Sequence, residues 1–124
     1  MNMVLLVAAG GAVGSVGRYL MASTLQRSSG WEFPLGTVLV NVLGCFLIGL
    51  LYVWLVARPD PREDLRGLLM VGVMGGFTTF SSFSLETVTL VLNGSYGNAL
   101  LNVAISLVAC LAGTWLGIAL ARIT

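Results

Sequence analysis

The sequence predicts an all-α membrane protein whose chain crosses the bilayer four times. Of its 124 residues, 57% are hydrophobic and only 9% are charged, and the mean hydropathy is +0.97. A soluble domain usually carries about 25% charged residues. A chain this short also leaves a large share of its surface exposed, so it cannot hide so much apolar area in one core. Lipid is therefore the expected solvent.

Composition also argues against several other classes of protein. All six basic residues are Arg, there is no His, and the formal net charge is +1, so no clustered basic face for nucleic acid is expected. The first residues lack the positive charge of a secretory signal peptide. Without a nucleophile–base pair or a cofactor motif, an enzyme is not expected. Cys45 and Cys110 both fall in apolar stretches and are predicted to be small packing residues.

We expect one four-helix transmembrane domain over residues 1–124. A bilayer core about 30 Å thick needs about 20 helical residues at about 1.5 Å each. The predicted spans are approximately residues 4–24, 35–57, 67–92 and 98–121. They are separated by a polar connection with an interfacial Trp31, by a loop at 58–66 with two prolines and six charges, and by a turn signal at 93–95. Arg side chains favour the face with the charged loop only weakly, so they do not fix one orientation.

The third span is predicted to be broken near the middle of the bilayer. Residues 72–84 combine a glycine pair with two Thr and three Ser, and these residues are poor helix formers. A break at Gly75-Gly76 is tolerated in lipid only where the freed backbone groups line a cavity or bind ions. Free carbonyls would hold a cation, and the next helix start would favour an anion. The alternative is a continuous helix whose small residues allow close packing.

Polar side chains form aligned stripes on three of the predicted helices. In the third span, two strips repeat every three residues, one aromatic and one of hydroxyls. In the second and fourth spans, polar residues repeat every four residues. The stripes are Phe77, Phe80 and Phe83; Thr78, Ser81 and Ser84; Thr37, Asn41 and Cys45; and Asn102, Ser106, Cys110 and Thr114. Each residue alone could simply bond a neighbouring helix, but three stripes together indicate a polar path.

The chemistry of this path favours an anion. It offers N–H and O–H donors and the positive edges of aromatic rings. Glu86 is the sole acid inside any span, whereas a cation or proton pathway usually holds carboxylates at its centre. Arg18 is expected either to snorkel near a helix end or to place a fixed positive charge in an aqueous vestibule. Gly10-x-x-x-Gly14 and Gly113-x-x-x-Gly117 are typical of closely packed membrane helices.

Three motifs resemble those of the Fluc-type (CrcB-like) fluoride channels, small bacterial fluoride exporters. The resemblance extends over essentially the whole chain. The motifs are Gly10-Gly11-x-x-Gly14-Ser15-x-x-Arg18-Tyr19, Gly36-Thr37-x-x-Val40-Asn41-x-x-Gly44 and Gly75-Gly76-Phe77-Thr78-Thr79-Phe80-Ser81-Ser82-Phe83. Ser15 stands where Ala is more usual, and Ser82 replaces a common Thr.

The resemblance implies an antiparallel, dual-topology homodimer in the bacterial inner membrane, with two pores along the subunit interface. It implies a central structural Na⁺ held by the carbonyls of Gly75 and Thr78 from both chains. Phe80 and Phe83 would contact fluoride by their ring edges, and Asn41 would donate to it. It also implies, less specifically, a polar track comprising Ser81, Ser84, Thr37, Ser106, Thr114 and Glu86. Cys110 stands where some relatives have a hydroxyl.

Two other functions remain compatible with a small four-span protein. A drug-efflux transporter of this size would use a membrane-embedded Glu on the first helix, where this chain has Arg18 and no acid. A structural subunit of a larger membrane complex would tolerate Asn41→Asp and Phe80→Ile as long as the protein still assembled. A fluoride channel needs neither an ATP motif nor a proton-coupling acid, because the membrane potential already drives anions outward.

Overall fold

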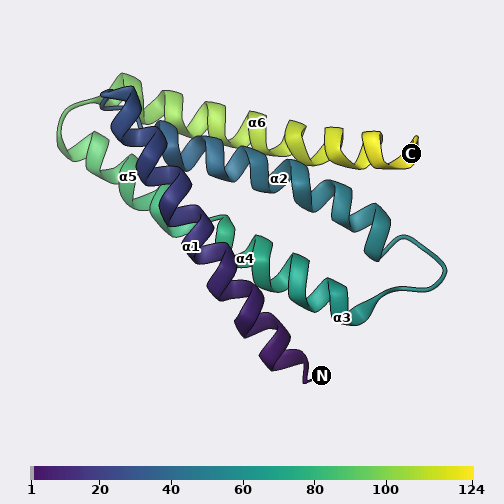
Figure 1. Ribbon diagram of the computed structural model, residues 1–124. Helices are drawn as coiled ribbons and strands as arrows, with labels where there is room; N and C mark the ends of the chain where they lie inside the picture. Colours follow the sequence, from purple (N-terminus) through teal and green to yellow (C-terminus); the bar gives the residue numbers. More distant parts are fainter. Residues whose placement is uncertain (1) are drawn as a thin grey trace.

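The computed structural model describes residues 2–124, which form helices joined by short connections (Figure 1). The elements are α1 (Met3–Ser29), α2 (Leu35–Leu55), α3 (Glu63–Leu65), the π-helical segment η1 (Arg66–Met74), α4 (Gly75–Phe77), α5 (Phe80–Leu92) and α6 (Tyr96–Arg122). Four stretches are long and apolar enough to cross a membrane: α1, α2, the run from Glu63 to Leu92, and α6. The predicted four-span architecture is confirmed, and the chain is a multi-pass membrane protein.

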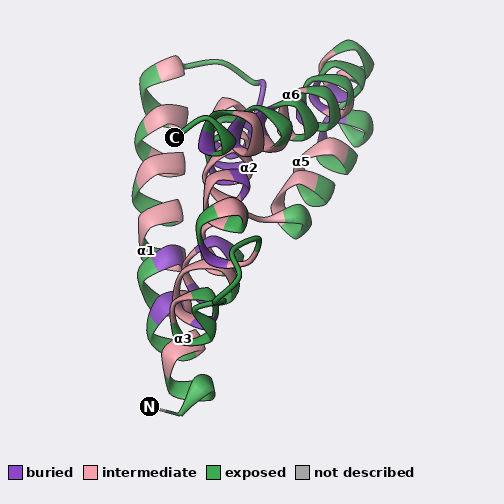
Figure 2. Cartoon of the chain, turned by 90° about the vertical axis from the view of Figure 1, so that its right-hand side faces the viewer, coloured by how far each residue is buried: buried purple, intermediate pink, exposed green. Residues whose placement is uncertain are grey.

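The helices pack as two close pairs, α2 with α6 and α1 with η1 and α4. Figure 2 shows α1 and α5 on opposite sides of α2. In Figure 1, the two termini and the 56–62 loop lie toward one end of the molecule, and the other two connections lie toward the opposite end. This arrangement agrees with the sidedness expected from the four spans.

Glycines allow both pairs to approach closely. A side chain at Gly10 or Gly14 of α1 would collide with the backbone of η1, near Leu68 and Val73. One at Gly117 of α6 would collide with the backbone of α2. The two small-residue motifs therefore lie at helix contacts, as their spacing predicts.

Much of the molecular surface is apolar. Few large side chains are buried, among them Phe33, Val40 and Leu90, whereas apolar residues from every long helix are exposed. Figure 2 shows exposed residues along the outer faces of α1, α5 and α6. Contiguous apolar surface on this scale is unfavourable in water and is expected where lipid or a second protein surface covers the helices.

The third span is broken, but not at the predicted residues. Gly75 keeps helical dihedral angles, with φ −61° and ψ −37°. The chain becomes extended at Thr78 (φ −87°, ψ 156°) and Thr79 (φ −150°, ψ 118°) instead. The predicted break at Gly75-Gly76 is therefore three residues too early. Glycine makes a helix locally weak, but the helix ends where another group can satisfy the released backbone.

Candidate functional site

The Asn41 side chain on α2 fixes the break in the third span. Its Oδ1 accepts a hydrogen bond from the Thr79 backbone N–H at 2.8 Å, and its Nδ2 donates to the Thr79 carbonyl at 2.9 Å. Asn41 is only 9% exposed, so both bonds are sheltered. One side chain therefore replaces the two helical hydrogen bonds that Thr79 would otherwise make. Gly44, one turn along α2, leaves space for the Thr78 side chain.

This arrangement releases two backbone carbonyls from their helical partners. In a continuous helix, Gly75 would accept from the N–H of Thr79, and Thr78 from the N–H of Ser82. Those N–H groups donate to side chains instead, to Asn41 Oδ1 and to Thr79 Oγ1. Carbonyl oxygens are hard ligands suited to a hard cation such as Na⁺. Gly75 and Thr78 therefore fit the cation role that the resemblance implies for them.

Arg18 lies beside the same break. Its Nε donates to the Gly76 carbonyl at 3.0 Å, across from α1 to α4. The side chain is half-buried, and this contact anchors its positive charge next to the broken segment. Its predicted role in an aqueous vestibule stays a prediction.

The start of α5 carries the aromatic pair. Thr79 caps the helix, since its Oγ1 accepts from the Ser82 N–H at 3.1 Å. Phe80 and Phe83 follow, with ring centroids 5.4 Å apart and ring planes inclined by 46°. The Phe80 ring is 76% exposed. A helix N-terminus carries partial positive charge, so this end of α5 favours an anion.

A cavity of about 240 Å³ adjoins the break and the aromatic pair. It is formed by α2, the break, α5 and α6. Its lining residues are Asn41, Cys45, Thr78, Thr79, Phe80, Phe83, Ser106, Leu107, Cys110 and Leu111. The structure thus brings together four predicted pore residues that are up to 65 positions apart in sequence, namely Asn41, Phe80, Phe83 and Ser106. We call this space the break cavity.

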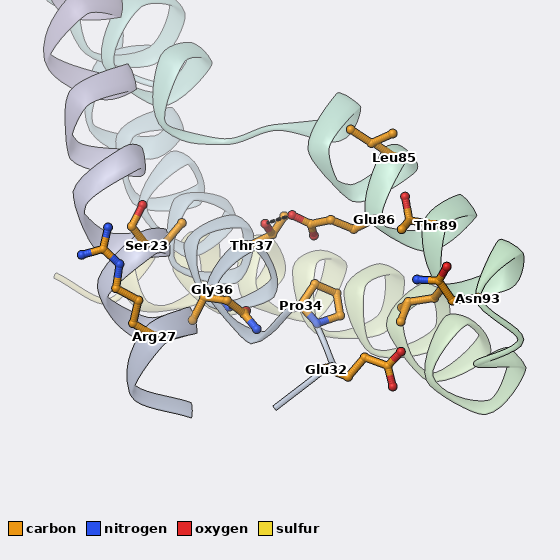
Figure 3. Close-up of a pocket in the computed structure, with 13 residues that line it drawn as sticks. Ser23, Arg27, Glu32, Pro34, Gly36, Thr37, Leu85, Glu86, Thr89 and Asn93 are labelled. Carbon is orange, nitrogen blue, oxygen red and sulfur yellow. Dashed lines mark hydrogen bonds between the residues drawn. The ribbon is translucent and has the colours of Figure 1, made fainter. Parts of the chain in front are cut away.

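A larger cavity, of about 650 Å³, opens between α1, α2 and α5. Figure 3 shows Thr37 and Glu86 pointing toward one another, with Arg27 and Glu32 farther out. The Thr37 hydroxyl donates to Glu86 Oε1 at 2.7 Å. The second oxygen, Oε2, is buried and has no hydrogen-bond partner among residues 2–124. We call this space the outer cavity; it joins two more of the predicted residues, Thr37 and Glu86.

Three predicted track residues lie outside both cavities. Ser81 and Ser84 are exposed on α5, where the Ser81 hydroxyl lies 3.2 Å from Thr79 Oγ1. Thr114 donates back to the Cys110 carbonyl at 3.1 Å and lines a separate cavity with Met70. Their roles in conduction stay predictions.

Sequence reasoning missed three polar residues that position the site. Thr79 is the residue at which the helix breaks, and it also caps α5. Gln26 bonds the connection between α1 and α2 by donating to Trp31 and Phe33 and accepting from Gly36. Thr87 accepts from Asn102, which in turn accepts from Ser106. An amide or hydroxyl in an otherwise apolar helix is the signal that could have found each of them.

Comparison with known proteins identifies the family. The family described as "CrcB-like protein, Camphor Resistance (CrcB)" matches residues 5–118. A Caulobacter vibrioides protein named "Fluoride-specific ion channel FluC" is 50% identical over 123 residues, covering 98% of this chain and 97% of the relative. Proteins with that name from Geobacter sulfurreducens (47% over 122 residues, 98% of each chain) and Coxiella burnetii (42% over 120 residues, 96% and 97%) are also similar.

The matches run nearly from end to end, and they include the break and both cavities. They favour a channel over the efflux transporter that the number of spans alone leaves possible. This chain is a member of the CrcB-like family, in which its named relatives are fluoride-specific ion channels.

Proposed function

We propose that the protein is a fluoride-selective passive channel that exports F⁻ across the bacterial inner membrane and relieves fluoride toxicity. One observation carries this: the break cavity gathers Asn41, Phe80 and Phe83 beside a capped helix start. The family relationship supplies the ion, since the similar proteins are named fluoride-specific. Transfer down the membrane potential yields about 2.3 kcal/mol per 100 mV for each charge, so no energy source within the protein is required.

The break cavity offers donors that can replace the water around a small anion. An Asn side chain has two amide N–H groups, and Thr79 uses one of those on Asn41. The second can donate to fluoride. The edges of the Phe80 and Phe83 rings carry partial positive charge. The Ser106 hydroxyl also lines the cavity, and it can donate to fluoride by giving up its bond to Asn102 Oδ1. Chloride is larger, and a narrow passage between such rings would exclude it.

The outer cavity is proposed as the approach to this passage. Thr37 and Glu86 hold one another in place there, and Arg27 places a positive charge at its edge. A fixed cation raises the local concentration of anions, and the acidic Glu32 at the same edge opposes this effect. The resemblance alone supports the proposal of three further track residues, Ser81, Ser84 and Thr114, and of Arg18 as a vestibule cation.

A structural Na⁺ is proposed at the break, held by Gly75 and Thr78. Support comes from the loss of both carbonyls' helical donors. Bound there, the ion would supply a fixed positive charge that ties the broken segments together. The resemblance further implies that two oppositely oriented chains share this ion in a homodimer, and the large exposed apolar surface leaves room for such an interface.

The test is fluoride efflux from liposomes that contain purified protein, measured with a fluoride electrode beside a chloride control. We expect rapid fluoride loss with chloride retained. Phe80→Ile and Phe83→Ile should slow fluoride or admit chloride, whereas Trp115→Leu, which replaces an exposed ring outside both cavities, should behave as the wild type. Absence of fluoride loss from vesicles containing folded protein and Na⁺ would overturn the proposal.

Dual topology needs a separate test. A single cysteine introduced into the 56–62 loop of a cysteine-free variant is labelled with an impermeant reagent added outside sealed vesicles. The vesicles are prepared from cell membranes, because reconstitution would randomise the orientation of the protein. If both orientations occur equally, the reagent should label about half of the chains in inside-out vesicles and about half in right-side-out vesicles. Labelling from only one side would refute opposed orientation without refuting a channel.

A further inference from the structure

Both cysteines of the chain face the break cavity. Cys45 comes from α2 and Cys110 from α6, and both are free thiols that are half-buried. The Cys45 Cβ lies 3.9 Å from the position that a Cβ on Gly113 would occupy, and Gly113 follows Cys110 by one helical turn. α2 and α6 pack closely against each other, so the two thiols line the same cavity from facing helices. The prediction that they are only packing residues does not explain why the pair lines a cavity.

The composition of the cavity restricts what two thiols could bind. Residues 2–124 contain no group of three or more His, Cys, Asp or Glu side chains placed so that they could hold a metal ion. A structural zinc site needs four such ligands, so zinc does not fit. Soft sulfur ligands select soft metal ions such as Cu⁺, and d¹⁰ monovalent ions of this class are stable with two ligands in a line. A pair of thiols on facing helices can supply that geometry.

We propose that Cys45 and Cys110 form a two-sulfur site for a soft monovalent cation, Cu⁺ or Ag⁺, and that its occupation blocks fluoride passage through the break cavity. The binding half stands on the thiol pair alone. The blocking half rests on the proposed function, because it requires the cavity to be part of the conduction path.

The binding step conserves atoms and charge without an oxidant. The S–H bond of one cysteine breaks, an S–metal bond forms, and the proton leaves to water. The second thiol coordinates as a neutral sulfur donor. One positive ion thus replaces one proton, and the site stays neutral, which favours it in a low-dielectric surrounding where a net charge is costly. The metal then occupies space between α2 and α6 that Asn41 and Phe80 also face.

Silver retention tests the binding half. Purified protein is incubated with Ag⁺ in chloride-free buffer, washed with free methionine to remove ions held by thioethers, and its silver is measured by mass spectrometry. We expect one ion per chain in the wild type and none in Cys45→Ser or Cys110→Ser, which keep side-chain size but lack a soft donor. Met70→Leu removes a soft sulfur from the neighbouring cavity and should retain one. Retention by either serine variant equal to the wild type would overturn the paired site.

Fluoride efflux with and without Ag⁺ tests the blocking half, with each variant compared with its own silver-free rate. We expect silver to abolish efflux in the wild type and in Met70→Leu, and excess dithiothreitol to restore it. The serine variants should keep their silver-free rates. Wild-type protein that retains silver yet conducts at its full rate would overturn the block. Because silver-free efflux is measured first, failure of the channel proposal itself would be recognised separately.

Discussion

Replacing Asn41 with Ala should release the break in the third span. The substitution removes both hydrogen bonds to the Thr79 backbone, at 2.8 and 2.9 Å. Stranding a buried donor or acceptor costs about 1–3 kcal/mol, which gives about 2–6 kcal/mol for the pair. Thr79 lines the break cavity, so water can partly solvate the stranded groups, and we expect a loss near 2 kcal/mol. That loss raises the opening equilibrium roughly 30-fold.

Hydrogen exchange at the Thr79 amide measures this opening directly, because Asn41 Oδ1 is its acceptor. Exchange should accelerate by roughly the same factor where it reports the opening equilibrium. Asn102→Ala is the matched control, since Asn102 is 1% exposed and also makes two side-chain hydrogen bonds, but to Thr87 and Ser106. It should leave Thr79 exchange unchanged. If the Thr79 amide of the Asn41→Ala protein exchanged at the same rate as in the wild type, the reasoning would be refuted.

Asn41→Asp separates the clamp from the anion contact. The carboxylate still has an oxygen to accept the Thr79 N–H, so Thr79 exchange should stay close to that of the wild type. The two amide N–H donors are lost, however, and a negative charge would repel fluoride, so efflux should fall steeply. Rapid efflux through Asn41→Asp would show that Asn41 does not contact the ion.

Three further predictions concern helix packing, helix capping and the hydrogen bond in the outer cavity. Gly14→Ala forces α1 away from the η1 backbone at Val73 and should cost about 1–3 kcal/mol. Gly17→Ala, whose Cβ would meet the Phe77 ring at an ordinary 3.7 Å, should not destabilise the protein. Equal melting temperatures of these two variants in detergent would contradict this. Thr79→Ala removes the α5 cap and should lower the stability of the protein by about 0.5–2 kcal/mol. Thr79→Ser should keep the wild-type melting temperature and efflux, and a Ser variant as impaired as the Ala variant would exclude capping as the cause. Thr37→Val leaves Glu86 without its hydrogen-bond donor and should slow fluoride efflux, whereas Thr37→Ser should not. Equal efflux rates in the two variants would show that the Thr37–Glu86 pair is not part of the pathway.

The number of spans and their packing faces could be predicted because they depend on local sequence. Hydropathy over about 20 residues identifies a helix long enough to cross the bilayer. Glycines spaced by four residues mark a face where backbones can approach, and Gly14 and Gly117 indeed lie against neighbouring backbones. Neither inference requires knowledge of which helices are neighbours.

The fourth-span stripe could be predicted only in part, because a spacing of four does not match the helical repeat. At about 3.6 residues per turn, each step of four residues turns about 40° around the axis. From Asn102 to Thr114 the direction therefore rotates by about 120°. Ser106 and Cys110 face the break cavity, whereas Thr114 has turned toward Met70. A stripe of this spacing is a spiral, and only its middle reaches one cavity.

The position of the break could not be predicted, because it depends on a partner far away in sequence. Propensity identifies Gly75 and Gly76 as weak points, but an opened helix in lipid must have its N–H groups satisfied. Asn41, from another helix, satisfies Thr79, and Thr79 Oγ1 satisfies Ser82. Because side-chain oxygens take these N–H groups, the carbonyls of Gly75 and Thr78 lose their helical donors. The same contacts that stabilise the break therefore make its carbonyls available to a cation, so loss of the Asn41 clamp should weaken the proposed Na⁺ site as well as fluoride passage.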